Sequence, residues 1–109
     1  MIELSDSDFR GKGLRIQERT VVLFHARWCP YCKELMPSFE EFAGGARVKV
    51  ARADISDYES PLWDTFAIEA VPTAILFDNG QVVGRIDSRM GDGITPEKFM
   101  EFAESTKSI

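Results

Sequence analysis

The segment Phe24-His25-Ala26-Arg27-Trp28-Cys29-Pro30-Tyr31-Cys32-Lys33 contains two cysteines three positions apart. They follow a short apolar run that begins just before this segment. The run itself, residues 21–26, has the length and composition of a β-strand that is buried on both faces. After the cysteines, apolar residues recur at the spacing of an amphipathic helix, at Leu35, Phe39, Phe42 and Ala43. Cys29 is therefore expected at the start of a helix that directly follows a strand.

This position favours a reactive thiol. Backbone N–H groups without partners and the positive end of the helix dipole both stabilise a thiolate, and Arg27 and Lys33 add positive charge nearby. Thiolate is the species that attacks a disulfide, so the pattern predicts Cys29 as the nucleophile. Cys32 lies one helical turn further on, where it can attack the Cys29 sulfur of a mixed disulfide. The spacing thus predicts a two-step thiol–disulfide exchange.

The sequence gives less support to two other roles for the cysteine pair, a structural disulfide and a metal site. A structural disulfide between residues so close together removes little entropy from the unfolded chain. A zinc site normally needs four ligands, and His25 is the one further candidate that the sequence offers. A metal or cluster shared across a dimer would also need ligands that the sequence does not show. We therefore expect no metal, and no cofactor besides the redox-active Cys29–Cys32 disulfide.

The remaining pattern predicts an α/β fold. Helices between strands imply parallel crossovers, whereas Asn79-Gly80 is a strong hairpin signal because both residues tolerate positive φ. The central sheet should therefore be mixed, with helices on both faces. Pro37 should kink the long helix, and Gly44-Gly45 should end it. Strands are expected at 2–4, 21–26, 47–55, 73–77 and 81–86, and helices after Ser5, at 61–66 and after Thr95.

Composition limits the functional class. A chain of 109 residues with 44% hydrophobic and 28% charged residues is expected to form one domain over residues 1–109. The net charge of −5 argues against nucleic acid or an anionic membrane as the main partner. No apolar run is long enough to cross a bilayer, and charged residues occupy the place of a signal sequence. We therefore expect a cytoplasmic monomer.

The chain resembles thioredoxins over nearly all of its length. The resemblance rests on the segment from Phe24 to Lys33, on Pro37, on Val71-Pro72-Thr73 before a strand, and on the Asn79-Gly80 hairpin. It implies the thioredoxin fold, with a central mixed sheet of four to five strands. It also implies a reductase of disulfides in target proteins that is itself reduced by a thioredoxin reductase.

The resemblance also implies roles for the neighbours of the cysteines. Pro72 would follow a cis peptide bond and lie against the dithiol, and the Val71 backbone would offer hydrogen bonds to an extended substrate. Trp28 would form part of the docking surface, together with Pro30 and Tyr31 of the motif. From the sequence alone, Trp28 is as readily a core aromatic, and most X-Pro bonds are trans.

The chain departs from the thioredoxin pattern at two places. Thioredoxins usually carry a buried acid six residues before the first cysteine, where this chain has Leu23, and the companion lysine corresponds to Arg52. The imidazole of His25 titrates near neutrality and is a conceivable substitute, although a packed or surface role is favoured. The Pro30-Tyr31 dipeptide is more typical of glutaredoxins, which place their motif near the chain start.

Two alternative functions stay open. One is a glutaredoxin-like reductase that depends on glutathione. The other is a non-catalytic thioredoxin-like module that holds client proteins in the groove around Trp28 and Pro72. The presence of both cysteines at a helix start argues against the second.

Overall fold

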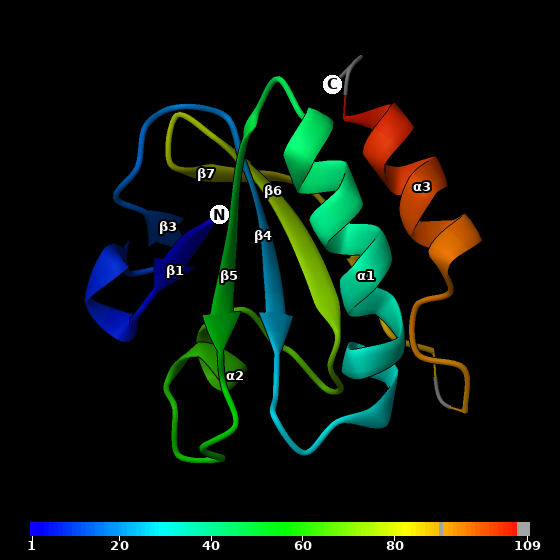
Figure 1. The fold of residues 1–109 in the computed structure, drawn as a ribbon. Helices are drawn as coiled ribbons and strands as arrows, with labels where there is room; N and C mark the ends of the chain where they lie inside the picture. Colours follow the sequence, from blue (N-terminus) through cyan, green and yellow to red (C-terminus); the bar gives the residue numbers. More distant parts are fainter. Residues whose placement is uncertain (90, 107–109) are drawn as a thin grey trace.

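A five-stranded mixed sheet forms the middle layer of the computed structural model, which describes residues 1–89 and 91–106 (Figure 1). The strand order is β1-β5-β4-β6-β7. The first three of these strands are parallel to one another, and β6 is antiparallel to both of its neighbours. The strands of this sheet are β1 (Ile2–Leu4), β4 (Thr20–His25), β5 (Lys49–Asp54), β6 (Thr73–Asp78) and β7 (Gln81–Asp87).

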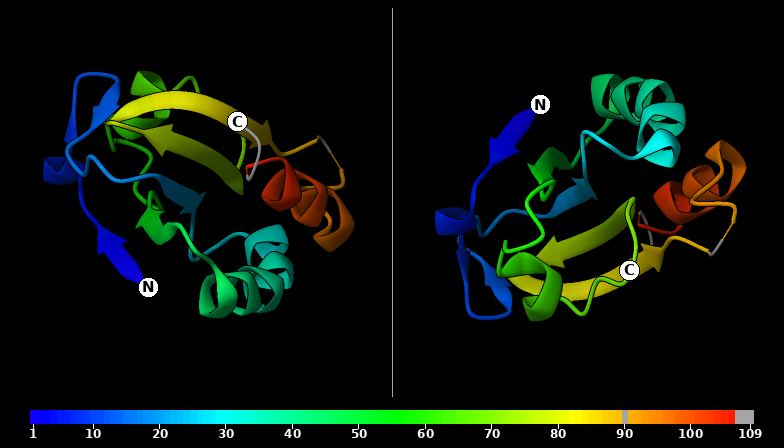
Figure 2. Two further views of the ribbon diagram at one scale, coloured as in Figure 1. Left: turned by 90° about the horizontal axis from the view of Figure 1, so that it is seen from above. Right: turned by 90° about the horizontal axis from the view of Figure 1, so that it is seen from below.

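The two faces of the sheet carry unequal layers. Helices α1 (Pro30–Gly45) and α3 (Pro96–Ser105) lie side by side on one face, and the short helix α2 (Leu62–Thr65) lies on the other (Figure 2). Alternate residues of β4 enter the two resulting cores: Leu23 packs with Leu35 and Phe39 under α1, whereas Phe24 packs with Phe66 on the α2 side. The predicted α/β fold, with helices on both faces of a mixed sheet, is confirmed.

The expected helix after Ser5 is wrong. Only one 3₁₀ turn, η1 (Asp6–Asp8), forms there, and the Asp8 carboxylate accepts a hydrogen bond from the Ser5 backbone N–H at 2.8 Å. The chain then makes a small antiparallel hairpin of β2 (Phe9–Arg10) and β3 (Gly13–Leu14). Gly11 takes a φ of +58°, which suits a tight turn and not a helix, and the hairpin buries Phe9 and Leu14 against the sheet.

The other expected elements are confirmed with small shifts of their ends. Helix α1 runs through Pro37 and ends at Gly45. Asn79 and Gly80 both have positive φ in the turn between β6 and β7. Among the helices of the described residues, none combines the length and apolarity that a membrane crossing requires.

Four loops lie at one edge of the sheet because of the directions in which the strands run. Since β4, β5 and β7 run the same way and β6 runs against them, the chain leaves the first three strands and enters the fourth at this edge. In Figure 1 it is the lower edge, where the tips of β4 and β5 lie next to the first turn of α1. The loops here include residues 26–29, 55–61, 70–72, 88–89 and 91–95.

Candidate active site

Cys29 caps the amino terminus of α1, as the sequence predicts. Its backbone is extended, with φ −95° and ψ 113°, and Pro30 follows as the first helical residue, where the missing N–H breaks no helical bond. The Cys29 Sγ accepts a hydrogen bond from the Cys32 backbone N–H at 3.1 Å. A helix N–H group therefore points at this sulfur and stabilises negative charge that develops on it.

Cys32 lies one turn into the helix and is held in a different environment. Only 2% of its surface is exposed, against 3% for Cys29, so exposure alone does not distinguish the two thiols. Burial raises the pKa of the Cys32 thiol well above its ordinary value, and a hydrogen bond with the Cys29 side chain raises it further. The two sulfur atoms are not bonded to each other, so the structure shows the dithiol form.

The segment before β6 lies against the first cysteine. The Cys29 thiol donates a hydrogen bond to the Val71 carbonyl oxygen at 3.4 Å. The Val71–Pro72 peptide bond is cis, as the resemblance implies. The Ser88 hydroxyl in turn donates to the Pro72 carbonyl oxygen, which joins the loop after β7 to this segment.

Trp28 is a surface residue, so the alternative of a core aromatic is wrong. Its side chain is 46% exposed, and its indole N–H donates to the Ser56 carbonyl oxygen at 2.9 Å. Its ring stacks on Tyr58, with centroids 5.1 Å apart, and on Trp63, with centroids 6.4 Å apart. Sequence reasoning assigned no role to Tyr58 or Trp63, although an aromatic residue between Asp57 and Glu59 is a signal of an exposed ring.

Tyr31 connects the cysteine motif to the loop after β7. Its hydroxyl donates a hydrogen bond to the Gly91 carbonyl oxygen at 2.7 Å. Its ring side chain also lies against Gly93, where a Cβ atom would stand 2.6 Å from the Tyr31 Cβ. Tyr31 is half-buried, whereas its neighbour Pro30 is exposed beside the cysteines.

Leu23 fills the position of the usual buried acid. It is completely buried under α1 and is the register partner of Arg52 on β5. Arg52 forms an ion pair with Glu3 on β1 and also donates from Nη1 to the Met36 Sδ at 3.6 Å. Arg52 thus keeps a positive charge at the position of the companion lysine, but it pairs with Glu3 on the neighbouring strand β1.

His25 lies two residues beyond Leu23 on the same face of β4 and is half-buried. Its Nε2 atom is buried and has no hydrogen-bond partner among the described residues. Burial lowers the pKa of His25, and the Arg52 charge lowers it further, while Asp54 and Glu3 oppose the shift. The packed role therefore describes its placement, and burial favours the neutral form of the imidazole.

The described part of the chain brings together no cluster of three or more His, Cys, Asp or Glu side chains. The expectation that the protein needs no metal stays a prediction.

Comparisons with known proteins agree with this geometry. The thioredoxin family model matches residues 1–103. The chain is 34% identical to "Probable thioredoxin-2" of Caenorhabditis elegans over 101 residues, which are 92% of this chain and 67% of that protein. It is 36% identical over 92 residues to "Bifunctional thioredoxin reductase/thioredoxin" of Mycobacterium leprae, covering 83% of this chain and 20% of that protein.

A solved structure supports the fold. The crystal structure of Chlamydomonas reinhardtii thioredoxin f2 superposes with a TM-score of 0.81, covering 100% of this chain and 98% of that one at 20% identity. The family match covers both cysteines and all strands of the sheet. The chain therefore belongs to the thioredoxin family, whose members are thiol–disulfide oxidoreductases.

Proposed function

We propose that this chain reduces disulfides of target proteins by dithiol exchange through Cys29 and Cys32. The Cys29 thiolate attacks one sulfur of the target disulfide, forms a mixed disulfide and expels the other target sulfur as a thiolate. Cys32 then loses its proton and attacks the Cys29 sulfur, which releases the second target thiolate. In the complete exchange, the target disulfide gains two electrons and two protons, and the chain is oxidised from the dithiol to its own Cys29–Cys32 disulfide.

The asymmetry between the two sulfurs carries this proposal. The Cys32 N–H bonds to the Cys29 sulfur at 3.1 Å, whereas the Cys32 thiol is buried with a raised pKa. The helix N–H therefore favours negative charge that develops on the first sulfur during exchange, and burial keeps the second sulfur protonated until a mixed disulfide forms. This difference supports attack by Cys29 and resolution by Cys32.

The surrounding residues suit an extended target segment. Trp28, Pro30 and Tyr31 contribute the motif side of the surface, and the Val71–Pro72 segment contributes the opposite side. When the Cys29 thiol is consumed in a mixed disulfide, the Val71 carbonyl loses its donor and becomes available to a backbone N–H of the target.

The proposed electron donor is a thioredoxin reductase. A relative that carries both names in one protein supports this pairing. A glutaredoxin-like use of glutathione is the second candidate, and the Pro30-Tyr31 dipeptide favours it. The cytoplasmic location and the monomeric state expected from the sequence belong to the same proposal.

Two cysteine variants test the function. Reduction of a disulfide-bonded test protein is measured with NADPH and a thioredoxin reductase, and separately with glutathione. Cys29→Ser should abolish turnover, and Cys32→Ser should trap the test protein as a stable mixed disulfide on Cys29, visible by mass spectrometry. Fast reduction by glutathione alone would support the glutaredoxin-like enzyme instead. Absence of reduction by the parent chain, together with binding of the test protein that Cys29→Ser leaves unchanged, would support the non-catalytic binding module.

A further inference from the structure

Three aromatic side chains form a stack at the protein surface beside the dithiol. This aromatic platform consists of Trp28, Tyr58 and Trp63. The Trp28 and Trp63 rings are inclined by 3°, and the Tyr58 ring lies 5.1 Å from the first and 5.8 Å from the second. Tyr58 is 73% exposed, the largest exposed fraction among the big hydrophobic residues of the described chain. Such an arrangement leaves aromatic faces open to a partner.

Backbone contacts hold the platform in place. The Trp28 indole N–H donates to Ser56, and the Trp63 indole N–H donates to the carbonyl oxygens of Ile55 at 3.1 Å and Asp57 at 3.2 Å. The loop after β5 is further joined to the end of β4 by the Ile55 N–H, which donates to the His25 carbonyl oxygen at 2.8 Å. Both indole donors are thus used within the protein, so a partner meets the ring faces and not the N–H groups.

The chain around the platform is strongly acidic. Residues 53–68, which include Tyr58 and Trp63, contain no lysine or arginine and have a formal charge of −4, from Asp54, Asp57, Glu59 and Asp64. Three of these carboxylates adjoin the platform in the sequence and are exposed: Asp57 and Glu59 flank Tyr58, and Asp64 follows Trp63. The platform is therefore an aromatic surface with an acidic border.

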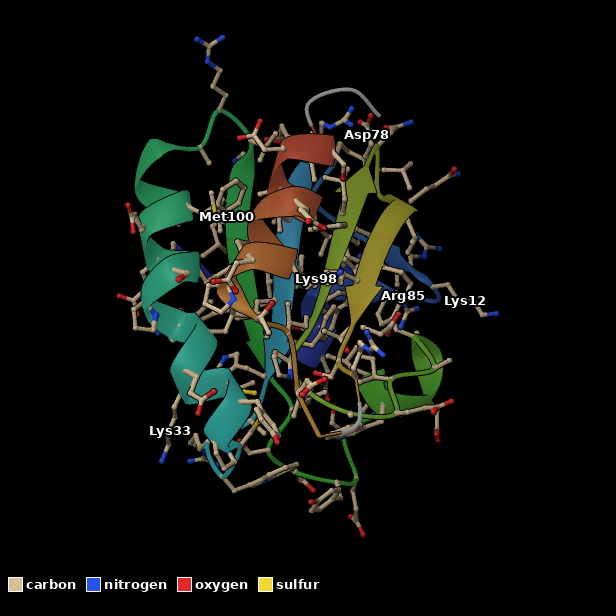
Figure 3. All side chains as sticks on the ribbon, turned by 90° about the vertical axis from the view of Figure 1, so that its right-hand side faces the viewer. Lys12, Lys33, Asp78, Arg85, Lys98 and Met100 are labelled. Carbon is tan, nitrogen blue, oxygen red and sulfur yellow. The ribbon has the colours of Figure 1, made fainter. Side chains whose placement is uncertain are left out.

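The positively charged side chains near the platform form ion pairs with acids outside its border, or point away from it. Arg27 forms an ion pair with Asp54 at 3.3 Å, and Arg85, which reaches the end of α2, is held by Asp87 at 2.7 Å. Lys33 projects outward from the first turn of α1, and Arg85 lies between β7 and α2 (Figure 3). The acidic charge of the border is thus left for a partner.

We propose that the aromatic platform binds a lysine or arginine side chain of the target protein close to the disulfide that Cys29 attacks. A cation over an aromatic face is attracted by the ring quadrupole, and carboxylates around the ring strengthen the attraction. Trp28 directly precedes Cys29, so a cation seated on the platform places the neighbouring target sulfur beside the nucleophile. This inference rests on the proposed function and names a substrate class for it.

The test uses three synthetic peptides with one intramolecular disulfide each, identical except for arginine, glutamine or glutamate beside a cysteine. Reduction by the full chain is measured as kcat/KM at low and high salt, with hydroxyethyl disulfide as an uncharged reference substrate. The arginine peptide should be reduced about two- to fivefold faster than the glutamine peptide, and the glutamate peptide more slowly still. Salt should reduce these differences.

Substitutions in the platform and its acidic border test whether they cause the preference for the arginine peptide. Tyr58→Ala and the pair Asp57→Asn with Glu59→Gln should each reduce the advantage of the arginine peptide, while turnover of hydroxyethyl disulfide stays unchanged. Tyr58→Phe keeps the aromatic face and should keep the preference. Glu97→Gln with Glu101→Gln removes the same charge from exposed positions of α3, away from the platform, and should leave the preference intact.

The outcomes separate this inference from the proposed function. Equal reduction of all three peptides, with hydroxyethyl disulfide also reduced, would overturn the inference and leave the reductase proposal standing. If no disulfide is reduced, the reductase proposal fails. In that case the platform is tested by peptide binding alone. The same peptides carry serine in place of cysteine, and tryptophan fluorescence measures their binding. Equal binding of the arginine and glutamate peptides overturns the inference in that case too.

Discussion

The Tyr31 hydroxyl donates a 2.7 Å hydrogen bond to the Gly91 carbonyl oxygen, which ties the residue between the two cysteines to the loop after β7. The same loop is joined to the segment before β6 through Ser88 and Pro72. Two side-chain hydrogen bonds thus fix three separate segments around Cys29. The residue between the cysteines therefore has a structural task as well as a place on the proposed docking surface.

Gly93 should be intolerant of any side chain, because the Tyr31 side chain occupies its space. In Gly93→Ala the new Cβ would lie 2.6 Å from the Tyr31 Cβ, at a φ of +65° that alanine disfavours. We expect a loss of roughly 1–3 kcal/mol in the free energy of unfolding, measured by urea denaturation. Gly44→Ala is the matched control, since a Cβ there meets nothing within 4 Å, and it should be neutral or stabilising. Equal stability of the two variants would contradict the packing described.

Tyr31→Phe isolates the hydrogen bond from the packing of the ring. Loss of one such bond should cost roughly 0.5–1.5 kcal/mol of stability. The amides of Asp92 and Gly93, which both donate to the Arg89 carbonyl oxygen, should then exchange faster with solvent in hydrogen-exchange measurements. Amides of β4 should be unaffected and serve as the internal reference. Unchanged exchange in the loop would show that the hydroxyl does not hold it.

The parts of the fold that local pattern dictates were predictable from the sequence. The apolar run of β4, the helical period after Cys32 and the Asn79-Gly80 turn each need only neighbouring residues to be recognised. The placement of Cys29 at a helix start follows from the first two of these. The family resemblance added the cis bond before Pro72, which no local pattern indicates.

Features that depend on distant contacts were not predictable. The hairpin after η1 exists because Phe9 and Leu14 are buried against a sheet whose strands lie far along the chain. The platform residue Tyr58 sits in a loop whose shape depends on bonds to the end of β4, such as the Arg27 N–H to the Ser56 hydroxyl at 2.7 Å. Trp63 falls within the expected short helix, but nothing local shows that its ring stacks on Trp28.

Leu23 should act as a core residue. It is fully buried between the sheet and α1, so Leu23→Ala should cost roughly 2–5 kcal/mol in the free energy of unfolding. Leu23→Met keeps the volume and should cost less than about 1.5 kcal/mol. Chemical denaturation measures both variants. A small effect of Leu23→Ala would mean that the site tolerates a cavity and is not the tightly packed core seen here.

The two cysteines should differ in their reaction with an alkylating reagent. Burial raises the pKa of the Cys32 thiol, so Cys32 should remain protonated and slow to react at neutral pH. Cys29 should react first, and mass spectrometry of digested protein identifies the labelled residue. The single variants Cys29→Ser and Cys32→Ser give the reference rates. Faster labelling of Cys32 would reverse the assignment of attacker and resolver.

His25 should make the protein less stable in mild acid. Burial, with the Arg52 charge, lowers its pKa in the folded state below the ordinary value of 6.5, while Asp54 and Glu3 oppose the shift. The unfolded chain therefore binds more protons between the two pKa values. The stabilising contribution is complete above pH 6.5 and is lost as the pH falls through the folded-state pKa. Because the chain has one histidine, the effect can be assigned to this residue.

His25→Gln should remove this component of the pH dependence. The free energy of unfolding is measured by urea denaturation across the acid range for both proteins, and the imidazole of the parent chain is titrated by NMR. The folded-state titration should have a midpoint below 6.5. Protonation of carboxylates such as Asp54 lowers stability further at more acid pH and should persist in the variant. A midpoint above 6.5 would mean that Asp54 and Glu3 outweigh burial, and stability would then rise, not fall, on entering mild acid.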